Sequence, residues 1–128
     1  MSAVLLDTHV LLWWLQGGSK LSPTARTIMQ NSGQVFVSAA SAWEIAIKHK
    51  AGKLEAAGGL IARFQSIIEA ENFLELPISV RHALEAGLLK GSHKDPFDRV
   101  LIAQARAEGV AVVSTDECFD DYGVSRLW

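Results

Sequence analysis

Four acidic residues that lie far apart along the chain each stand next to a segment typical of a parallel α/β sheet. They are Asp7, Glu44, Asp98 and Asp116. Because open parallel sheets place their sites at the carboxyl ends of the strands, we expect these side chains to lie together. Clustered carboxylates repel one another unless a hard divalent cation neutralises them. The pattern therefore predicts metal-dependent chemistry, with phosphate esters as the favoured substrates.

Apolar segments alternate with helical segments along the whole chain. Strands are predicted at residues 3–7, 35–38, 73–76 and 110–114, with a short edge strand at 124–127. Helices are predicted at residues 9–15, 23–29, 41–50, 60–68, 79–88 and 97–108. This alternation indicates an α/β fold, a parallel β-sheet flanked by helices on both faces. Asp7 would end the first strand, and Asp116 would follow the fourth.

Composition limits the class of protein. A chain of 128 residues with 49% hydrophobic residues is predicted to form one domain, residues 1–128. The net charge of −2 gives no global positive field, so contact with nucleic acid would need a local basic patch. Cys118 is the only cysteine, which excludes an intrachain disulfide and fits a reducing compartment. With no apolar run long enough for a membrane span and no basic leader, a cytoplasmic location is expected.

Each acid also has a structural interpretation. Asp7 could cap the helix that follows it, and Asp116 could cap a turn before Glu117. Glu44 could complete a capping box begun by Ser41, and Asp98 could do so with Asp95. Asp95 precedes Pro96 and fits a helix cap better than a metal ligand, although both roles stay open. These interpretations explain each acid separately but not their shared location.

Hydroxyl groups near the acids are candidates to orient them. Ser114 and Thr115 directly precede Asp116, at the predicted end of the fourth strand. Hydrogen-bond donors behind a carboxylate commonly hold it in position for a metal ion. We therefore expect Ser114 and Thr115 to be auxiliary site residues.

A family resemblance rests on four stretches that occur in this order. They are Leu5-Leu6-Asp7-Thr8-His9-Val10-Leu11-Leu12-Trp13, Val37-Ser38-Ala39-Ala40-Ser41-Ala42-Trp43-Glu44-Ile45, His93-Lys94-Asp95-Pro96-Phe97-Asp98-Arg99-Val100-Leu101-Ile102-Ala103-Gln104-Ala105, and Ser114-Thr115-Asp116-Glu117 with Tyr122-Gly123 beyond it. The chain resembles the PIN-domain ribonucleases, specifically the VapC-type toxins of bacterial toxin–antitoxin pairs. The resemblance extends from Val4 to Trp128.

The resemblance implies an activity and partners. It implies endonucleolytic cleavage of RNA that depends on Mg²⁺ or Mn²⁺, with Asp7, Glu44, Asp98 and Asp116 as the acidic catalytic and metal-binding site. It also implies a homodimer and a cognate VapB-like antitoxin whose tail blocks the active site. One local departure concerns Asp95 and Asp98, which flank Pro96-Phe97 where many of these toxins have one aspartate; we favour Asp98 as the residue that approaches the metal.

Basic residues close to the acids are candidates for RNA contacts. Lys48 follows Glu44 on the same predicted helix, while Lys94 and Arg99 flank Asp98. Lysine and arginine bind a nucleic-acid backbone electrostatically without reading its sequence. An ordinary solvated helix face is the alternative interpretation of Lys48.

Two other functions are considered. A phosphatase of the haloacid-dehalogenase type also begins with an aspartate at a strand end, but it carries a second aspartate two positions later, where this chain has His9. A catalytically inactive α/β binding module would use the carboxylates to hold a structural cation or to cap helices. Metal-dependent turnover separates this module from a nuclease.

Overall fold

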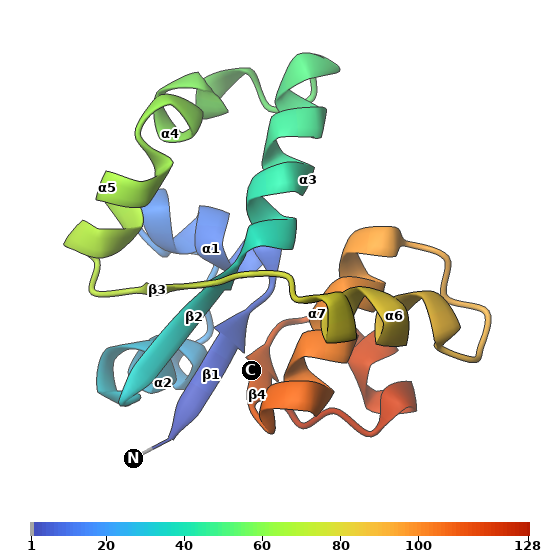
Figure 1. The fold of residues 1–128 in the computed structure, drawn as a ribbon. Helices are drawn as coiled ribbons and strands as arrows, with labels where there is room; N and C mark the ends of the chain where they lie inside the picture. The colour runs from blue at the N-terminus through green and yellow to red at the C-terminus, as the bar shows by residue number, and fades with distance from the viewer. Residues whose placement is uncertain (1) are drawn as a thin grey trace.

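The computed structural model describes residues 2–128, which fold around a five-stranded, fully parallel sheet with strand order β3-β2-β1-β4-β5 (Figure 1). In chain order the elements are β1 (Ala3–Leu6), α1 (Thr8–Leu15), α2 (Pro23–Asn31), β2 (Gln34–Ser38), α3 (Ala39–Lys50), η1 (Glu55–Ala57), α4 (Gly58–Ala62), α5 (Phe64–Ala70), β3 (Leu74–Leu76), α6 (Val80–Leu88), α7 (Pro96–Glu108), β4 (Ala111–Val113), η2 (Glu117–Tyr122) and β5 (Arg126–Leu127). The predicted α/β class and the order of strands and helices are confirmed.

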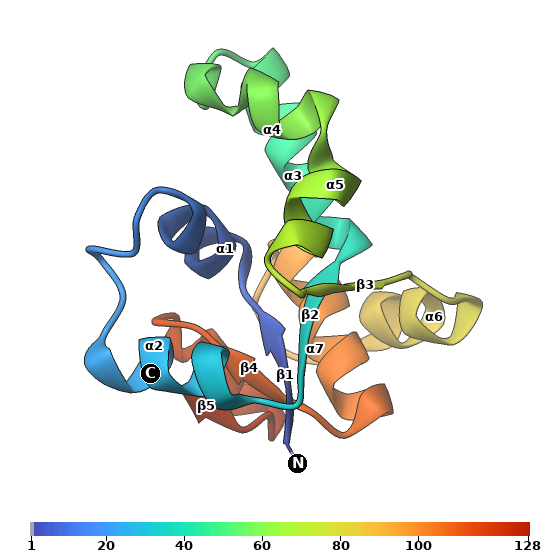
Figure 2. The same ribbon diagram turned by 90° about the vertical axis from the view of Figure 1, so that its left-hand side faces the viewer.

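Each face of the sheet contributes side chains to a separate apolar core. Successive side chains of a strand point to opposite faces. Val4 and Leu6 therefore enter the first core, while Leu5 enters the second. Helices α1 and α2 cover the first face, and α6 and α7 lie on the opposite side (Figures 1 and 2). Both faces of β1 are therefore dry, which explains its uninterrupted apolar sequence.

The start of α3 differs from the prediction. Ser38, the last residue of β2, caps the helix by accepting a hydrogen bond from the Ala40 amide at 2.9 Å. Ser41, predicted to begin a capping box with Glu44, instead lies inside the helix and accepts a hydrogen bond from Thr8 at 2.9 Å. The strand runs into the helix without a loop, so the cap falls at the strand end and Glu44 lies in the second turn.

The predicted helix at residues 60–68 is split. Helices α4 and α5 meet at Arg63, whose φ of −132° and ψ of 32° break the helical hydrogen bonding. The chain has already reversed direction between α3 and α4 (Figure 1), and Leu60 and Phe64, on the two sides of the break, both pack against the first core. Packing on the sheet therefore overrides the continuous amphipathic pattern of this segment.

Three other helix boundaries match the predicted helix ranges to within one residue. Ser79 caps α6 within a capping box completed by His82, and Asp95 caps α7. Gly109 ends α7 in the left-handed conformation, with φ of 67°, which favours glycine. Within residues 2–128, no helix is long and apolar enough to cross a membrane.

Gln104 of α7 joins three elements beneath the carboxyl end of the sheet. It is completely buried. Its carbonyl accepts a hydrogen bond from Ser38 at 2.6 Å, and its amide donates to the Leu76 and Pro77 carbonyls at 3.4 and 3.2 Å. This amide therefore fixes the ends of β2 and β3 against the helix that carries Asp98.

Replacing Gln104 by leucine should destabilise the protein. The substitution leaves the Ser38 hydroxyl and the Leu76 carbonyl buried without their partner, at a cost of about 1–3 kcal/mol for each such group. Urea unfolding measures the loss. The matched control Gln30→Leu changes an exposed glutamine of α2 and should alter the free energy of unfolding by less than about 0.5 kcal/mol. Equal stability of the two variants would contradict the structural role of Gln104.

Candidate active site

A cavity of about 400 Å³ opens at the carboxyl ends of β1 and β4. After β1 the chain builds the sheet outward on one side, with β2 and β3, and then returns to the other side of β1 to form β4. The carboxyl end of β1 is therefore the reversal point of the sheet, the place where ligands bind in open parallel sheets. The lining side chains are Asp7, His9, Trp13, Glu44, Lys48, Asp95, Asp98, Thr115 and Asp116. The structure thus brings all four predicted acids to one cavity.

Asp7 is at the centre of the carboxyl edge of the sheet. It follows Leu6, which pairs with Val37 of β2 and Val113 of β4. The same register, continued by one residue, places Asp7 level with Ser38 and Ser114. The residue is only 6% exposed, and its carboxylate accepts a hydrogen bond from the Ser114 hydroxyl at 2.6 Å. The sheet register therefore fixes both the position and the orientation of this carboxylate.

Burial makes the charged form of Asp7 costly. Desolvation raises the pKa of Asp7, the Ser114 hydrogen bond and the charge of His9 lower it, and the nearby charge of Glu44 raises it further. Positive charge inside the cavity would offset both the desolvation and the repulsion between carboxylates.

Glu44 faces the cavity from α3 and is 4% exposed. Its partner is Lys48, one turn later, whose ammonium lies 2.6 Å from the carboxylate. This hydrogen bond raises the pKa of Lys48 and keeps the lysine charged. Lys48 is therefore at the edge of the acidic cavity, as a counter-charge to one of its carboxylates.

Asp98 occupies the first turn of α7, where a carboxylate is also favoured by the helix dipole. Its Oδ2 lies 2.9 Å from Nε2 of His93. Desolvation raises the pKa of Asp98 to about 6; the His93 hydrogen bond lowers it, whereas the charges of Asp95 and Asp7 raise it. Asp98 therefore changes its charge close to neutral pH.

Asp95 is a helix cap and also lies in the acidic cavity. One carboxylate oxygen accepts hydrogen bonds from the Phe97 and Asp98 amides at 2.9 and 3.1 Å, so the residue is the helix cap. The same side chain lines the acidic cavity. Asp98 does not complete a capping box with Asp95, because its carboxylate is bonded to His93.

Arg99 organises the loop that precedes α7. Its guanidinium donates hydrogen bonds to the Ala86 and His93 carbonyls at 3.1 and 2.8 Å, and to the Leu89 carbonyl. Arg99 lines neither this cavity nor the larger one beside it. Because its donors are committed to the chain itself, Arg99 positions His93 and, through it, Asp98.

Asp116 is the exposed member of the group. Its carboxylate accepts a hydrogen bond from the Cys118 amide at 2.9 Å, and its own amide donates to the Ser114 hydroxyl, also at 2.9 Å. Ser114 therefore connects Asp7 with Asp116 through one buried oxygen. Thr115 lines the cavity between them.

Three residues at or next to the cavity were not among the predicted site residues. His9 and Trp13 stand one turn apart on α1 and both line the cavity, their ring centroids 6.1 Å apart. Their spacing of four residues, directly after Asp7, is the sequence signal that places them there. The third is His93, whose contact with Asp98 depends on the loop held by Arg99 and has no local signal.

The donor set fits a hard divalent cation. The four acids offer carboxylate oxygens only, the ligand type that such cations prefer. Their oxygens do not form a tight direct-ligand cluster. Among residues 2–128, the group with ligand atoms all within 4.8 Å of one another is His93, Asp98 and Cys118. The acidic cavity therefore suits a cation that retains several of its waters.

Comparison with known proteins agrees with this architecture. The profile of the PIN domain family matches residues 4–124. The chain is 28% identical over 116 residues to Ribonuclease VapC22 of Mycobacterium tuberculosis, covering 91% of this chain and 88% of that protein. The fold is similar to that in the VapBC2 structure from Rickettsia felis, bound to a promoter DNA fragment, with a TM-score of 0.68, 13% identity and coverage of 98% and 99%. It is also similar to M. tuberculosis VapC20, a toxin that cleaves the Sarcin-Ricin loop, with a TM-score of 0.69, 13% identity and coverage of 94% and 95%.

The raised pKa of Asp98 predicts a pH-dependent difference between the wild type and Asp98→Asn. Protonation favours the folded state here, so the contribution of Asp98 to stability is present near its ordinary pKa of 3.8 and is lost as the pH rises through about 6. In EDTA, the free energy of unfolding of the wild type relative to Asp98→Asn should fall over this range by on the order of 1–3 kcal/mol. Urea unfolding across the pH series tests this, and a constant difference would contradict it.

Proposed function

The chain belongs to the PIN domain family, and from this premise we propose that it is a metal-dependent endoribonuclease that acts as the toxin of a VapBC-like toxin–antitoxin pair. The observation that carries the proposal is the convergence of Asp7, Glu44, Asp98 and Asp116 on one cavity at the reversal point of the sheet. The likeness to a ribonuclease over nearly the whole chain supports RNA as the substrate. Family membership also favours this function over a haloacid-dehalogenase-type phosphatase.

In this proposal the cation is Mg²⁺ or Mn²⁺. When bound, such an ion supplies stabilisation of charge on the phosphoryl oxygens and a lower pKa for a bound water. Asp7, Asp98 and Asp116 are the principal ligands, and Glu44 binds directly or through water. Ser114 keeps Asp7 oriented, and Lys48 balances the charge of Glu44 while the cavity holds no cation.

Water, rather than a side chain, is the nucleophile of the proposed reaction. Cys118 is the one cysteine near the acids. Desolvation, followed by the charge of Asp116, raises the pKa of its thiol well above the ordinary value. A neutral thiol is a weak nucleophile, so Cys118 has no covalent role in the cleavage.

The proposed partners are a VapB-like antitoxin and a second copy of the chain. Solved structures of similar fold include VapBC and FitAB complexes bound to DNA, which supports an antitoxin partner. Helix α6 presents Val80 and Leu84, which are 77% and 62% exposed. Exposed apolar side chains gathered on one helix mark contact with another protein. The proposed place of action is the cytoplasm, where the RNA substrate is found.

Binding of the metal should stabilise the folded chain. A cation that binds only the folded state, at a free concentration a hundred times its dissociation constant, stabilises that state by about 2.7 kcal/mol. Millimolar Mg²⁺ or Mn²⁺ should therefore raise the Tm by several degrees. Differential scanning fluorimetry measures this shift independently of activity. Asp98→Asn should shift less than the wild type, and no shift in the wild type would count against the cation site.

Replacing Asp7 by asparagine should abolish cleavage while keeping the fold. The substitution preserves the shape of the side chain and removes the charge that holds the cation. Since mutation of residues behind metal ligands already costs about 10–100-fold, loss of Asp7 should lower the rate by about 100-fold or more. The assay follows the cleavage of total cellular RNA by purified, antitoxin-free protein, with Mg²⁺ or Mn²⁺ and with EDTA.

The control for this assay is Glu69→Gln, which neutralises an exposed carboxylate of α5 outside the cavity. It should cleave like the wild type. Undiminished cleavage by a clean preparation of Asp7→Asn would overturn the assignment of the site. Absence of cleavage by every folded preparation would favour the inactive binding module.

A further inference from the structure

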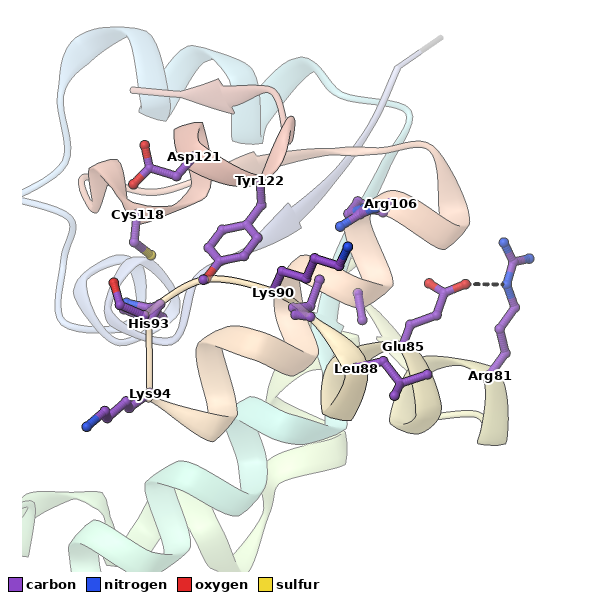
Figure 3. Close-up of a pocket in the computed structure, with 14 residues that line it drawn as sticks. Arg81, Glu85, Leu88, Lys90, His93, Lys94, Arg106, Cys118, Asp121 and Tyr122 are labelled. Atoms are coloured by element: carbon purple, nitrogen blue, oxygen red, sulfur yellow. Dashed lines mark hydrogen bonds and ion pairs between the residues drawn. The ribbon is translucent and has the colours of Figure 1, made fainter.

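A second and larger cavity, of about 1260 Å³, adjoins the acidic one. It is bounded by α6, the loop of residues 89–95, α7 and η2, and Figure 3 shows the side chains that line it. Its volume exceeds the roughly 300–1,000 Å³ typical of sites for drug-sized ligands, so it can accept more than one nucleotide.

Two residues form the boundary between the cavities. His93 lines the larger cavity and contacts Asp98 of the acidic one at 2.9 Å. Cys118 also lines the larger cavity, and its amide donates to Asp116 of the acidic one at 2.9 Å. The larger cavity is therefore separated from the proposed metal ligands Asp98 and Asp116 by one layer of residues.

The two cavities carry opposite charge. Five carboxylates and one lysine line the acidic cavity. In the larger cavity Arg81 pairs with Glu85, which leaves Lys90, Lys94 and Arg106 against Asp121. Within residues 2–128, none of these three cations forms an ion pair. The larger cavity thus supplies the local basic patch that the net charge of −2 does not.

The loop that carries Lys90 is held in a fixed shape. Arg99 donates hydrogen bonds to the carbonyls of Leu89, the first residue of this loop, and His93, two residues before its end. Gly91, with φ of 103°, packs so closely on Tyr122 that an added Cβ would lie 2.7 Å from the phenol oxygen. In Figure 3 the Lys90 and Arg106 side chains lie toward the middle of the cavity, whereas Lys94 extends away from it. Lys90 and Arg106 are therefore the better-placed cations.

We propose that the cavity between α6, the 89–95 loop, α7 and η2 binds the RNA strand beside the scissile phosphate, with Lys90 and Arg106 contacting its backbone phosphates. The proposal rests on the proposed ribonuclease function and adds the path of its substrate. The acidic cavity attracts the cation and repels the RNA backbone. The neighbouring cationic cavity compensates by attracting the phosphates that flank the cleaved bond.

The test measures RNA binding in EDTA, which prevents cleavage, by fluorescence anisotropy of a labelled oligouridine across a salt series. Lys90→Ala/Arg106→Ala is compared with Lys20→Ala/Lys53→Ala, which removes two exposed lysines from outside both cavities. On single strands each lost phosphate contact reduces the magnitude of the slope of log affinity against log salt by about 0.7. For Lys90→Ala/Arg106→Ala the magnitude of the slope should therefore fall by about 1.4. The control variant should keep the wild-type slope. Unchanged Tm values check that the variants, all at exposed positions, are folded.

Each other outcome is decisive. Equal slopes for the two double variants would overturn the proposed path, and metal-dependent cleavage by the wild type would then leave the ribonuclease function standing. Absence of both binding and cleavage in the folded wild type would overturn both proposals. If polyglutamate of equal charge displaces the oligouridine as well as unlabelled oligouridine does, the cavity is a site for an acidic protein segment rather than for RNA.

Discussion

Repulsion between carboxylates at the carboxyl end of β1 is the constraint on which the rest of the site depends. Asp7 is fixed by the sheet register, and its charge is disfavoured by burial. Each acid is held by a separate partner: Ser114 for Asp7, Lys48 for Glu44, His93 for Asp98 and the Cys118 amide for Asp116. These partners keep the carboxylates oriented and spread apart, so the fold tolerates the cluster at a cost that a cation can remove.

The same arrangement makes cation binding a competition. A cation that approaches Asp98 competes with His93 for the carboxylate, and one that approaches Glu44 competes with the Lys48 ammonium. Ser114 need not be displaced, because its hydroxyl binds only one oxygen of Asp7, Oδ2. On cation binding the hydroxyl at the end of β4 would therefore stay in place, whereas the two basic side chains would be displaced.

The sequence was sufficient to predict the sheet, the order of its elements and the four acids that meet at its edge, because each of these leaves a local pattern. Asp95-Pro96 and Gly109 mark the ends of α7 in the same way. Ser38 and Ser41 have equally good capping chemistry, and only the point where β2 ends decides between them. The role of Arg99 depends on carbonyls up to 13 residues away, brought together by the packing of α6 on α7, which no local pattern encodes.

We propose that the four acids bind a divalent cation at the reversal point of the sheet. Anomalous diffraction from crystals of the protein soaked in Mn²⁺ locates such an ion. We expect a manganese peak in the acidic cavity, bound by Asp7, Asp98 and Asp116, with Asp98 turned from His93 toward the ion. A peak at the His93, Asp98 and Cys118 cluster instead, or no peak beside Asp7, would contradict it.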